Sequence, residues 1–445
     1  MTTIEGVQTP VGTIVPAARR LSKGDVKTLS LSALGGALEF YDFVIFIYFT
    51  AAISKVFFPP DMPEWLRVVQ TFGIFAAGYL ARPIGGILFA HFGDLIGRKR
   101  MFALSIFLMA LPCLAIGFLP TYATIGIAAP LLLLLFRIMQ GAAIGGEVPG
   151  GWVFVAEHVP ASRMGFGTAV LSSGIMVGAC LGSMAAYLLH AIYTPAELLS
   201  LGWRVAFIAG GVFGLIAVYL RRWLEETPVF VELKTRGRLA KELPVWIVIR
   251  EHKRAVLVLG VLTLVFSSAV VGVSLLAPTL FQSYFKIDPT SSFLASAMGT
   301  IIFAIGLVAG GASFDRFGAK SLIGWGIFYG VAYVVFFTLL KSNPALLFPL
   351  YALASFGAGA LLGVVPPLTI PMFPAEVRFS GFSFSYNCSY AIFGSVTPFA
   401  MITSLQYTQI GPPLYIALMG ALATLVGLYL VITGIKPEAQ GNKVA

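Results

Sequence analysis

The chain has very little charge for its length: only 11% of its 445 residues are Asp, Glu, Lys or Arg. Soluble domains carry about 25% charged residues, so this sequence does not provide the surface of an ordinary soluble protein. Instead, 58% of the residues are hydrophobic, and there are 48 glycines and 26 prolines. Glycine lets membrane helices approach closely, and proline kinks are tolerated among neighbouring helices. A lipid bilayer is therefore the expected environment.

Cysteine and histidine are also scarce. Cys113, Cys180 and Cys388 lie far apart in apolar stretches, without CxxC or Cys/His ligand spacing, so we expect buried thiols, no disulfide, no metal and no cofactor. The four histidines are scattered, and there is no P-loop or nucleophile motif, which argues against an enzyme. The polar stretch 1–27 contains no apolar core followed by a cleavage site, so no signal peptide is expected.

Twelve apolar stretches are long enough to cross a bilayer, which takes about 20 residues. We expect spans near 28–53, 66–91, 101–119, 130–156, 165–191, 203–222, 255–281, 292–312, 321–340, 346–370, 380–404 and 412–434. With a cytoplasmic N-terminus, most Lys and Arg residues fall on the inner side, and the positive-inside rule then places both termini in the cytoplasm. Topology thus explains the net charge of +10 better than nucleic-acid binding does.

Two charged segments occur twice in the chain. GDLIGRKR at 93–100 is echoed by FDRFGAK at 314–320, and EHVPASR at 157–163 is answered by PAEVR at 374–378. The duplication predicts an all-α membrane protein of twelve transmembrane helices in two pseudo-symmetric halves. The expected parts are a cytoplasmic tail 1–27, a six-helix bundle 28–222, a cytoplasmic linker 223–254, a second six-helix bundle 255–435 and a tail 436–445.

The acidic-glycine-basic loop, present in both halves, resembles the signature of the major facilitator superfamily. Further segments are similar to its metabolite:proton symporter family, namely ALEFYDF at 37–43, ARPIGG at 81–86, RIMQG at 137–141 and LEETPVF at 224–230. That family includes carriers of citrate, 2-oxoglutarate, shikimate, proline and betaine. The resemblance implies a multi-pass protein of the bacterial inner membrane that moves a small organic solute with protons by alternating access. A parallel repeat places the solute site near the midplane, between the halves.

Five ionisable residues lie inside the expected spans: Glu39, Asp42, Arg82, Arg137 and Glu147. A charge at the bilayer centre costs about 2.5–3.5 kcal/mol on insertion scales, so such residues mark pathways or pair with one another. At about 1.5 Å per residue, Asp42 and Arg137 lie roughly 22 and 28 Å from the cytoplasmic ends of their spans, and Arg82 and Glu147 both lie roughly 14 Å. These depths predict the pairs Asp42–Arg137 and Glu147–Arg82. The alternative is that fixed ion pairs staple the helices together.

We expect Asp42 to be the proton site, with Arg137 and Glu39 in the same coupling group. The pair Asp42–Arg137 resembles the aspartate-arginine couple of proton-linked sugar carriers. A guanidinium holds a buried carboxylate ionised, and the carboxylate gains a proton when that partner turns toward a bound anion. Arg82 and Arg137 are also the basic groups available for a solute carboxylate, because the forked donors of arginine suit bidentate recognition. An anionic solute is favoured, with a zwitterionic osmolyte such as proline or betaine as the alternative.

The eleventh stretch carries one polar stripe. Ser383, Tyr386, Asn387 and Tyr390 recur at i, i+3, i+4 and i+7, the spacing of one helix face. The stripe either hydrogen-bonds the solute or bonds to neighbouring helices. Further candidates for the solute site are Tyr41, Glu147 and Gln282.

The charged loop residues resemble the family's network that latches the inner gate. These residues are Asp94, Arg98, Glu157 and Arg163 in the first half and Asp315, Arg316, Glu376 and Arg378 in the second. The alternative is that they only set topology. A channel or a receptor would not need such duplicated gate loops. The expected partners are therefore a small organic solute, protons and lipid, with the protein acting as a monomer.

Overall fold

The computed structural model describes residues 20–240 and 242–434. In this part of the chain, twelve helices are long and apolar enough to cross a membrane, and one lies at each expected stretch, so the prediction of twelve spans is confirmed. They are α1 (Lys23–Tyr48), α3 (Glu64–Ile96), α4 (Arg98–Phe118), α6 (Ala128–His158), α7 (Met164–Ile192), α9 (Trp203–Arg221), α12 (Lys253–Ser267) together with its helical continuation to Leu275, α14 (Pro289–Phe317), α15 (Lys320–Ser342), α16 (Leu347–Thr369), α17 (Arg378–Tyr407) and α18 (Gly411–Ile432).

The first span begins earlier than expected. Ser22 and Asp25 form a capping box, in which the Ser22 side chain accepts from the Asp25 N–H and the Asp25 carboxylate accepts from the Ser22 N–H. The box satisfies orphan donors of the first turn, so α1 starts at Lys23 rather than at residue 28. Within the predicted tails, residues 1–19 and 436–445 lie outside the described residues.

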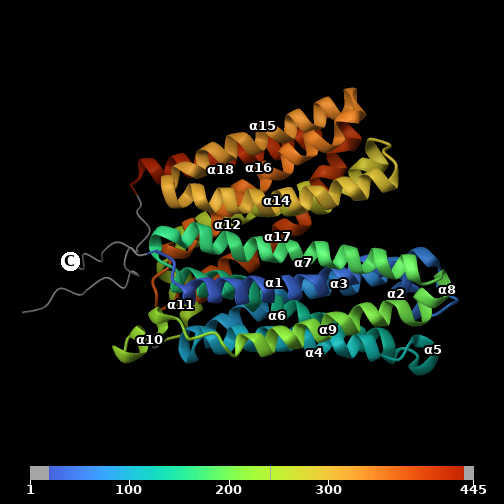
Figure 1. Ribbon diagram of the computed structural model, residues 1–445, viewed down its shortest axis with the longest axis horizontal. Helices are drawn as coiled ribbons and strands as arrows, with labels where there is room; N and C mark the ends of the chain where they lie inside the picture. The colour runs from blue at the N-terminus through green and yellow to red at the C-terminus, as the bar shows by residue number, and fades with distance from the viewer. Residues whose placement is uncertain (1–19, 241, 435–445) are drawn as a thin grey trace, which may run out of the picture.

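Short helices connect the spans at both ends of the bundle. One end, the linker end, carries α10 (Pro228–Thr235) and α11 (Pro244–Glu251), and the other carries α2 (Thr50–Val56), α5 (Tyr122–Ile125) and α8 (Pro195–Glu197). Because each half has an even number of spans, the start of α1 and the end of α18 also lie at the linker end (Figure 1).

The two halves repeat the same helix pairing. In the first half α1 packs on α7, α3 on α6 and α4 on α9; in the second half α12 packs on α17, α14 on α16 and α15 on α18. Numbered as spans, these are pairs 1–5, 2–4 and 3–6, followed by 7–11, 8–10 and 9–12. The expected pseudo-symmetric halves are therefore present in the packing as well as in the loop motifs.

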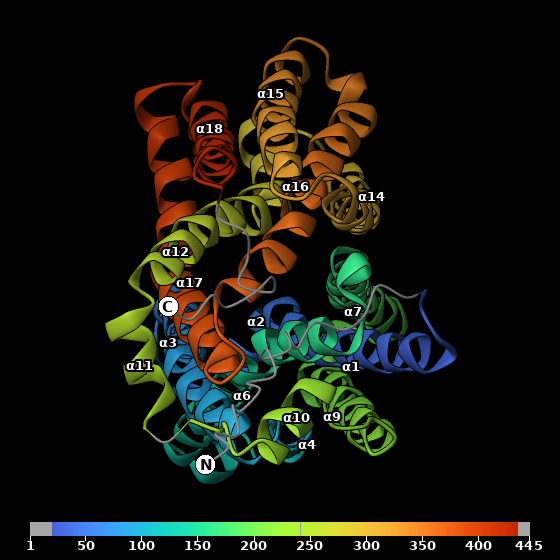
Figure 2. The same cartoon turned by 90° about the vertical axis from the view of Figure 1, so that its left-hand side faces the viewer.

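The halves meet along two helix pairs, α3 with α17 and α7 with α14. Figure 2, which looks onto the linker end, shows the first half below and the second half above, with these helices at the boundary. The internal repeat relates α3 to α14 and α17 to α7. It therefore exchanges the two pairs. Each half thus offers the other the same two helices.

One wall of the interface is an irregular helix. After Ser267, α12 continues as a π-helical segment, Ser268–Leu275, followed by α13 (Ala277–Thr279) and a second π-helical segment, Leu280–Tyr284. π-helical turns are rare and occur frequently at functional sites. The first π-helical segment supplies Val270 and Leu275 to the cavity described below.

Glycine permits the closest contact inside the first half. A Cβ at Gly85 on α3 would overlap the backbone of Ala142 on α6, and a Cβ at Gly145 would overlap the Arg82 carbonyl. Gly73, on the same helix as Gly85, has no neighbouring atom within 4 Å of such a Cβ. The α3–α6 contact therefore requires the absence of a side chain at Gly85 but not at Gly73.

We predict that Gly85→Ala lowers both the melting temperature and the yield of folded protein in detergent, because α3 and α6 must separate to admit the methyl group. The matched variant Gly73→Ala should leave the melting temperature unchanged or raise it, since alanine is favoured over glycine in a helix by about 1 kcal/mol. Equal melting temperatures for the two variants would contradict this account of the packing.

Candidate functional site

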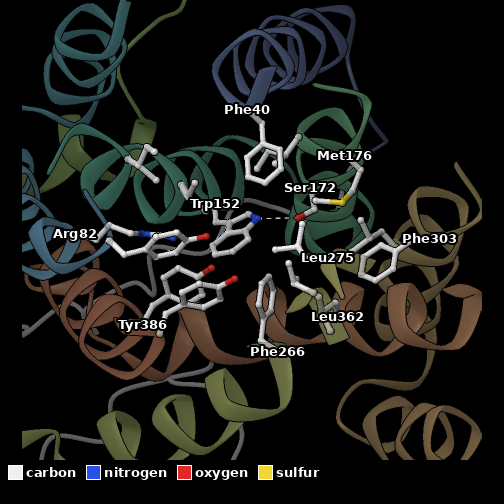
Figure 3. Close-up of a pocket in the computed structure, with 17 residues that line it drawn as sticks. Phe40, Arg82, Trp152, Ser172, Met176, Phe266, Leu275, Phe303, Leu362 and Tyr386 are labelled. Carbon is white, nitrogen blue, oxygen red and sulfur yellow. Dashed lines mark hydrogen bonds between the residues drawn. The ribbon is translucent and has the colours of Figure 1, made fainter. Parts of the chain in front are cut away.

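A cavity of about 60 Å³ lies between the halves, and since one water needs roughly 10–15 Å³, it has room for a few waters or a small solute. The first half contributes side chains from α1, α3, α6 and α7, and the second half from α12, its π-helical extension, α14, α16 and α17. Figure 3 shows Arg82 reaching in from one side and Tyr386 and Phe266 from the other. The lining residues are Phe40, Tyr79, Arg82, Ile144, Val148, Trp152, Ser172, Ile175, Met176, Phe266, Val270, Leu275, Phe303, Leu307, Leu362, Tyr386 and Tyr390.

Arg82 is the one formally charged residue among those that line the cavity. Its side chain is buried, and its guanidinium carbon lies 4.9 Å from the ring centre of Tyr390, 5.5 Å from that of Tyr79 and 6.0 Å from that of Tyr386. Within the described side chains, no carboxylate forms an ion pair with it. Aromatic faces attract a cation, and the buried Nε of Arg82 has no hydrogen-bond partner among the described atoms, so this donor is available to a ligand.

The rest of the cavity is aromatic and aliphatic. The Trp152 ring stands edge-to-face against Tyr386 at 5.2 Å and against Phe266 at 5.8 Å, and its Nε1–H donates to Ser172 Oγ at 2.8 Å (Figure 3). These contacts join α6 to α7 and to the second half, so they fix the position of the Trp152 ring in the cavity wall. Sequence reasoning missed Trp152 because a single apolar residue within a span carries no functional signal.

The polar stripe of α17 divides into two pairs of residues. Tyr386 and Tyr390 line the cavity, and their contact with a solute stays a prediction. Ser383 donates to the Gly86 carbonyl at 3.0 Å, and Asn387 donates to the Gly145 carbonyl at 2.7 Å. Ser383 and Asn387 therefore make the interhelical bonds of the alternative interpretation, and they join the two halves.

Asp42 and Arg137 meet through a third residue, Gln140. Arg137 Nη1 donates to Gln140 Oε1 at 2.9 Å, and Gln140 Nε2 donates to Asp42 Oδ2 at 2.6 Å. The thiol of Cys113 donates to the other carboxylate oxygen, Oδ1. All four side chains are buried, so the structure brings together the acid and the base that the sequence analysis paired.

Arg137 does not line the cavity but lies behind its wall. Its guanidinium carbon is 4.3 Å from the Phe46 ring centre and 5.7 Å from that of Phe75. The Phe75 ring in turn stands edge-to-face against Tyr79, a cavity residue, at 5.2 Å. A layer of aromatic rings thus separates the Asp42 group from the cavity.

The predicted pair Glu147–Arg82 is wrong. Glu147 on α6 forms a buried ion pair with Arg221 at the end of α9 and also accepts from Ser105 on α4. Equal depth in the membrane does not fix the direction in which a helical side chain points, and Glu147 points into the first half, whereas Arg82 points to the boundary between the halves. Since Glu147 is not among the residues that line the cavity, its carboxylate serves the packing of α4, α6 and α9.

The other solute candidates lie elsewhere. Tyr41 packs inside the first half, where its hydroxyl donates to the Ala206 carbonyl at 3.3 Å. Gln282 lies in the second π-helical segment and is not among the residues that line the cavity. Glu39 belongs to α1, but its side chain lies outside the described residues.

The linker end is closed by contacts between the halves. Asp94, at the end of α3, accepts from the backbone N–H of Ser380 at 2.9 Å, in the first turn of α17. Asp315, at the end of α14, accepts from the N–H groups of Gly165 at 2.6 Å and Phe166 at 2.9 Å, in the first turn of α7. Each acid thus binds the positive end of a helix in the opposite half. The repeat relates the two contacts.

An ion-pair chain reinforces this closure. Glu157 pairs with Arg98 at 3.1 Å and with Arg378 of the other half at 3.0 Å, and Arg98 donates to the Ala375 carbonyl at 2.7 Å. We call the set that joins the halves the linker-end latch; its members are Asp94, Arg98, Glu157, Asp315 and Arg378.

The remaining predicted gate residues differ. Glu376 pairs with Arg238 of the linker at 2.7 Å, and Arg316 lies over the Phe317 ring, its guanidinium carbon 5.1 Å from the ring centre. Arg163 ends the short 3₁₀ turn before α7. Within the part of the chain that the structure describes, these three side chains form no hydrogen bond or ion pair between the halves.

A bundle of two repeated halves with a solute-sized cavity between them, closed at one end by paired contacts, defines the class of secondary transporters. A family model described as Major Facilitator Superfamily matches residues 44–398, and the chain belongs to that superfamily. This membership makes it a multi-pass membrane transporter rather than an enzyme.

Two curated relatives are similar over most of their length. A putative proline/betaine transporter of Staphylococcus aureus is 33% identical over 431 residues, covering 94% of this chain and 90% of that protein. The citrate-proton symporter of Klebsiella pneumoniae is 32% identical over 382 residues, covering 84% of each. These names are consistent with the metabolite:proton symporter family within the superfamily. Among solved structures, the proton:xylose symporter XylE of E. coli superposes with a TM-score of 0.73 at 18% identity, covering 93% of this chain and 97% of that one, and shares the fold.

We predict that Glu157→Gln exposes the cavity to the linker side more often, because it weakens two ion pairs of the latch. A cysteine placed at Val148, in a background without the two partly exposed native cysteines, should react about tenfold faster with an impermeant maleimide applied from that side, since a shift of about 1.4 kcal/mol is a tenfold change.

The matched control is Glu376→Gln, which removes a half-exposed ion pair at the same end and should leave the labelling rate near that of the parent. Equal rates for Glu157→Gln and its parent would remove Glu157 from the latch.

Proposed function

We propose that the protein is a proton-coupled symporter of a small organic acid, working as a monomer in a bacterial inner membrane with both termini and the linker in the cytoplasm. The observation that carries this proposal is Arg82: a buried guanidinium that faces a cavity between the halves and has no ion-pair partner among the described carboxylates. A buried charge without a partner is costly, and a solute carboxylate would supply that partner.

The cavity favours a solute with a single carboxylate. Arg82 supplies one positive charge, and the other lining residues are neutral, with hydroxyl groups from Ser172 and three tyrosines. A tricarboxylate would leave further charges buried against aromatic rings without partners. The single guanidinium can hold one carboxylate in bidentate fashion, while the solute body contacts the wall formed by Trp152 and Phe266.

Asp42 is the proton site of the proposal. As an anion it accepts from both Gln140 and Cys113, and the positive charges of Arg82 and Arg137 favour that anion. A carboxylate bound at Arg82 cancels part of this positive field, and through the low dielectric of the protein it makes protonation of Asp42 more favourable. By linkage, a protonated Asp42 also strengthens solute binding. Solute and proton therefore load together.

The two bundles, 28–222 and 255–435, rock about the cavity in alternating access, and the linker 223–254 connects them. In the structure the linker-end latch is closed, which in the proposed orientation shuts the cytoplasmic side. The latch consists of charge and helix-end contacts that water replaces on opening, so the two states need differ by only a few kcal/mol.

A zwitterionic osmolyte is the second candidate. The aromatic faces of Trp152, Phe266 and Phe40 suit a quaternary ammonium, while Arg82 takes the carboxylate. The putative proline/betaine transporter with 33% identity supports this alternative.

We predict that Asp42→Asn abolishes uphill accumulation driven by an inward acid gradient, because the amide mimics a permanently protonated acid. Exchange of labelled solute across the membrane should continue, since binding at Arg82 is retained. The measurement is uptake into vesicles with and without a protonophore.

The control for this prediction is Tyr41→Phe, which removes only a hydroxyl group from the residue that precedes Asp42. This variant should accumulate solute as the parent does. Protonophore-sensitive accumulation by Asp42→Asn would exclude Asp42 as the coupling site.

We predict that Arg82→Gln weakens binding of the transported carboxylate by about 10- to 100-fold, since hydrogen bonds to charged groups contribute about 1.5–3 kcal/mol. Arg82→Lys should fall between this variant and the parent, because it keeps the charge and loses the fork. Calorimetric binding to the purified proteins tests both, and unchanged affinity in Arg82→Gln would remove Arg82 from the solute site.

The same binding assay separates the two solute classes. Glycine betaine and its neutral-headed isostere 3,3-dimethylbutanoate carry the same carboxylate and the same shape. Tighter binding of the isostere supports an organic-acid carrier, whereas tighter binding of betaine supports the osmolyte carrier.

A further inference from the structure

The two oxygens of the Asp42 carboxylate have partners of different kinds. Oδ2 accepts from the Gln140 amide at 2.6 Å, and Oδ1 accepts from the Cys113 thiol. Gln140 comes from α6 and Cys113 from α4, so the carboxylate is held from two sides. The two partners differ in whether their hydrogen bond to Asp42 can be redirected to another acceptor.

Gln140 has a fixed direction. A guanidinium only donates hydrogen bonds, so the Gln140 oxygen must face Arg137, which donates to it at 2.9 Å. The NH₂ group then points at Asp42. As long as this arrangement persists, Oδ2 meets a donor and is a poor place for a proton.

Cys113 has a choice of two acceptors. Its sulfur lies 3.2 Å from the Phe207 carbonyl oxygen of α9 as well as against Asp42 Oδ1. The thiol carries one hydrogen, so it donates to one of these oxygens at a time. When the hydrogen turns to Phe207, the sulfur presents its weak acceptor side to Oδ1.

We propose that Cys113 is a positioning residue that makes Oδ1 of Asp42 the oxygen that receives the coupled proton. This inference rests on the proposed function, in which Asp42 is the proton site. In the ionised state the thiol donates to Oδ1 and stabilises the carboxylate. In the protonated state the O–H on Oδ1 donates to the sulfur, and the S–H donates to the Phe207 carbonyl.

The step is a simple proton transfer. One proton from water is bound to Oδ1 during loading and is returned to water during release. The thiol keeps its own hydrogen throughout and is neither ionised nor oxidised. Only the direction of the S–H bond changes, while Gln140 and Arg137 stay in place.

Among the described side chains, few other ionisable groups interact with the group of Asp42 and Cys113. Arg137 of α6 is the cation, and the titratable hydroxyls are those of Tyr41 on α1 and Tyr79 on α3. From α9 the contact with Cys113 is a backbone carbonyl. A change in pH dependence after substitution of Cys113 therefore reports on the Asp42 pair with its thiol.

The first test is the pH profile of solute transport. Cys113→Ala removes a donor from the ionised carboxylate, so the proton is held to higher pH, and the midpoint should move by about one pH unit to the alkaline side. Cys113→Ser, whose hydroxyl also donates and accepts, should restore the parental midpoint. Cys180→Ala is the matched control and should leave the midpoint unchanged.

The second test needs no substitution at Cys113. In a variant with Cys180 and Cys388 replaced by alanine, the infrared S–H stretch comes from Cys113 alone, and its frequency reports the acceptor. The band should shift with the same pH midpoint as transport, and Asp42→Asn should abolish that shift.

The inference is overturned if the frequency of the S–H band does not change with pH. It is also overturned if Cys113→Ala folds, binds solute and keeps the parental pH midpoint of transport. If either occurs while Asp42→Asn is uncoupled, the proposed function stands without the thiol. If Asp42→Asn still accumulates solute with the acid gradient, the proposed function itself fails.

Discussion

A charge buried among apolar side chains must find a partner inside the protein, and this constraint sorts the ionisable residues of the first half into three kinds. Glu147 and Arg221 satisfy each other, with Ser105 as a further donor, so their pair is closed to solvent and solute. Asp42 is held by neutral donors, Gln140 and Cys113, which stabilise an anion without preventing its protonation. Arg82 has aromatic faces around it and no described carboxylate as an ion-pair partner, and its Nε has no hydrogen-bond partner among the described atoms. The structural pair, and the roles proposed for Asp42 and Arg82, thus follow from the partners that each charge has inside the protein.

The contacts between the halves obey a related rule. Asp94 and Asp315 each bind the N-terminal backbone of a helix in the opposite half rather than a long side chain. Backbone N–H groups at a helix start are fixed and unsatisfied within the helix, so a carboxylate at the right position binds them without ordering a flexible partner. Water serves both groups once the halves separate. Such reversible contacts suit the proposed gate, and the internal duplication provides them twice.

Twelve spans, two halves and the latch acids were predictable from the sequence because apolar length and a repeated loop motif are local signals. The group of Asp42 and Arg137 was also predictable, since a charge within a span is conspicuous, but Gln140 between them carried no charge to mark it. The Glu147 partner was missed because Arg221 sits at the end of a span, where positive charge is ordinarily topogenic. A signal existed: Gly210, Gly214, Ala217 and Arg221 follow helical spacing on α9, and the small residues of that face are buried, so Arg221 belongs to the packed side. The start of α1 was also predictable, because Ser22 and Asp25 have the spacing of a capping box.

The aromatic layer between the cavity and Asp42 gives the proposed coupling its physical basis. Tyr79 contacts Arg82 on one side and Phe75 on the other, and Phe75 lies beside Arg137. Apart from the Tyr79 hydroxyl, the rings of this layer are apolar. Such a layer keeps the local dielectric low, and charges interact across a low dielectric much more strongly than in water. In the proposed mechanism, a carboxylate that binds at Arg82 therefore acts on Asp42 through the electric field rather than by direct contact.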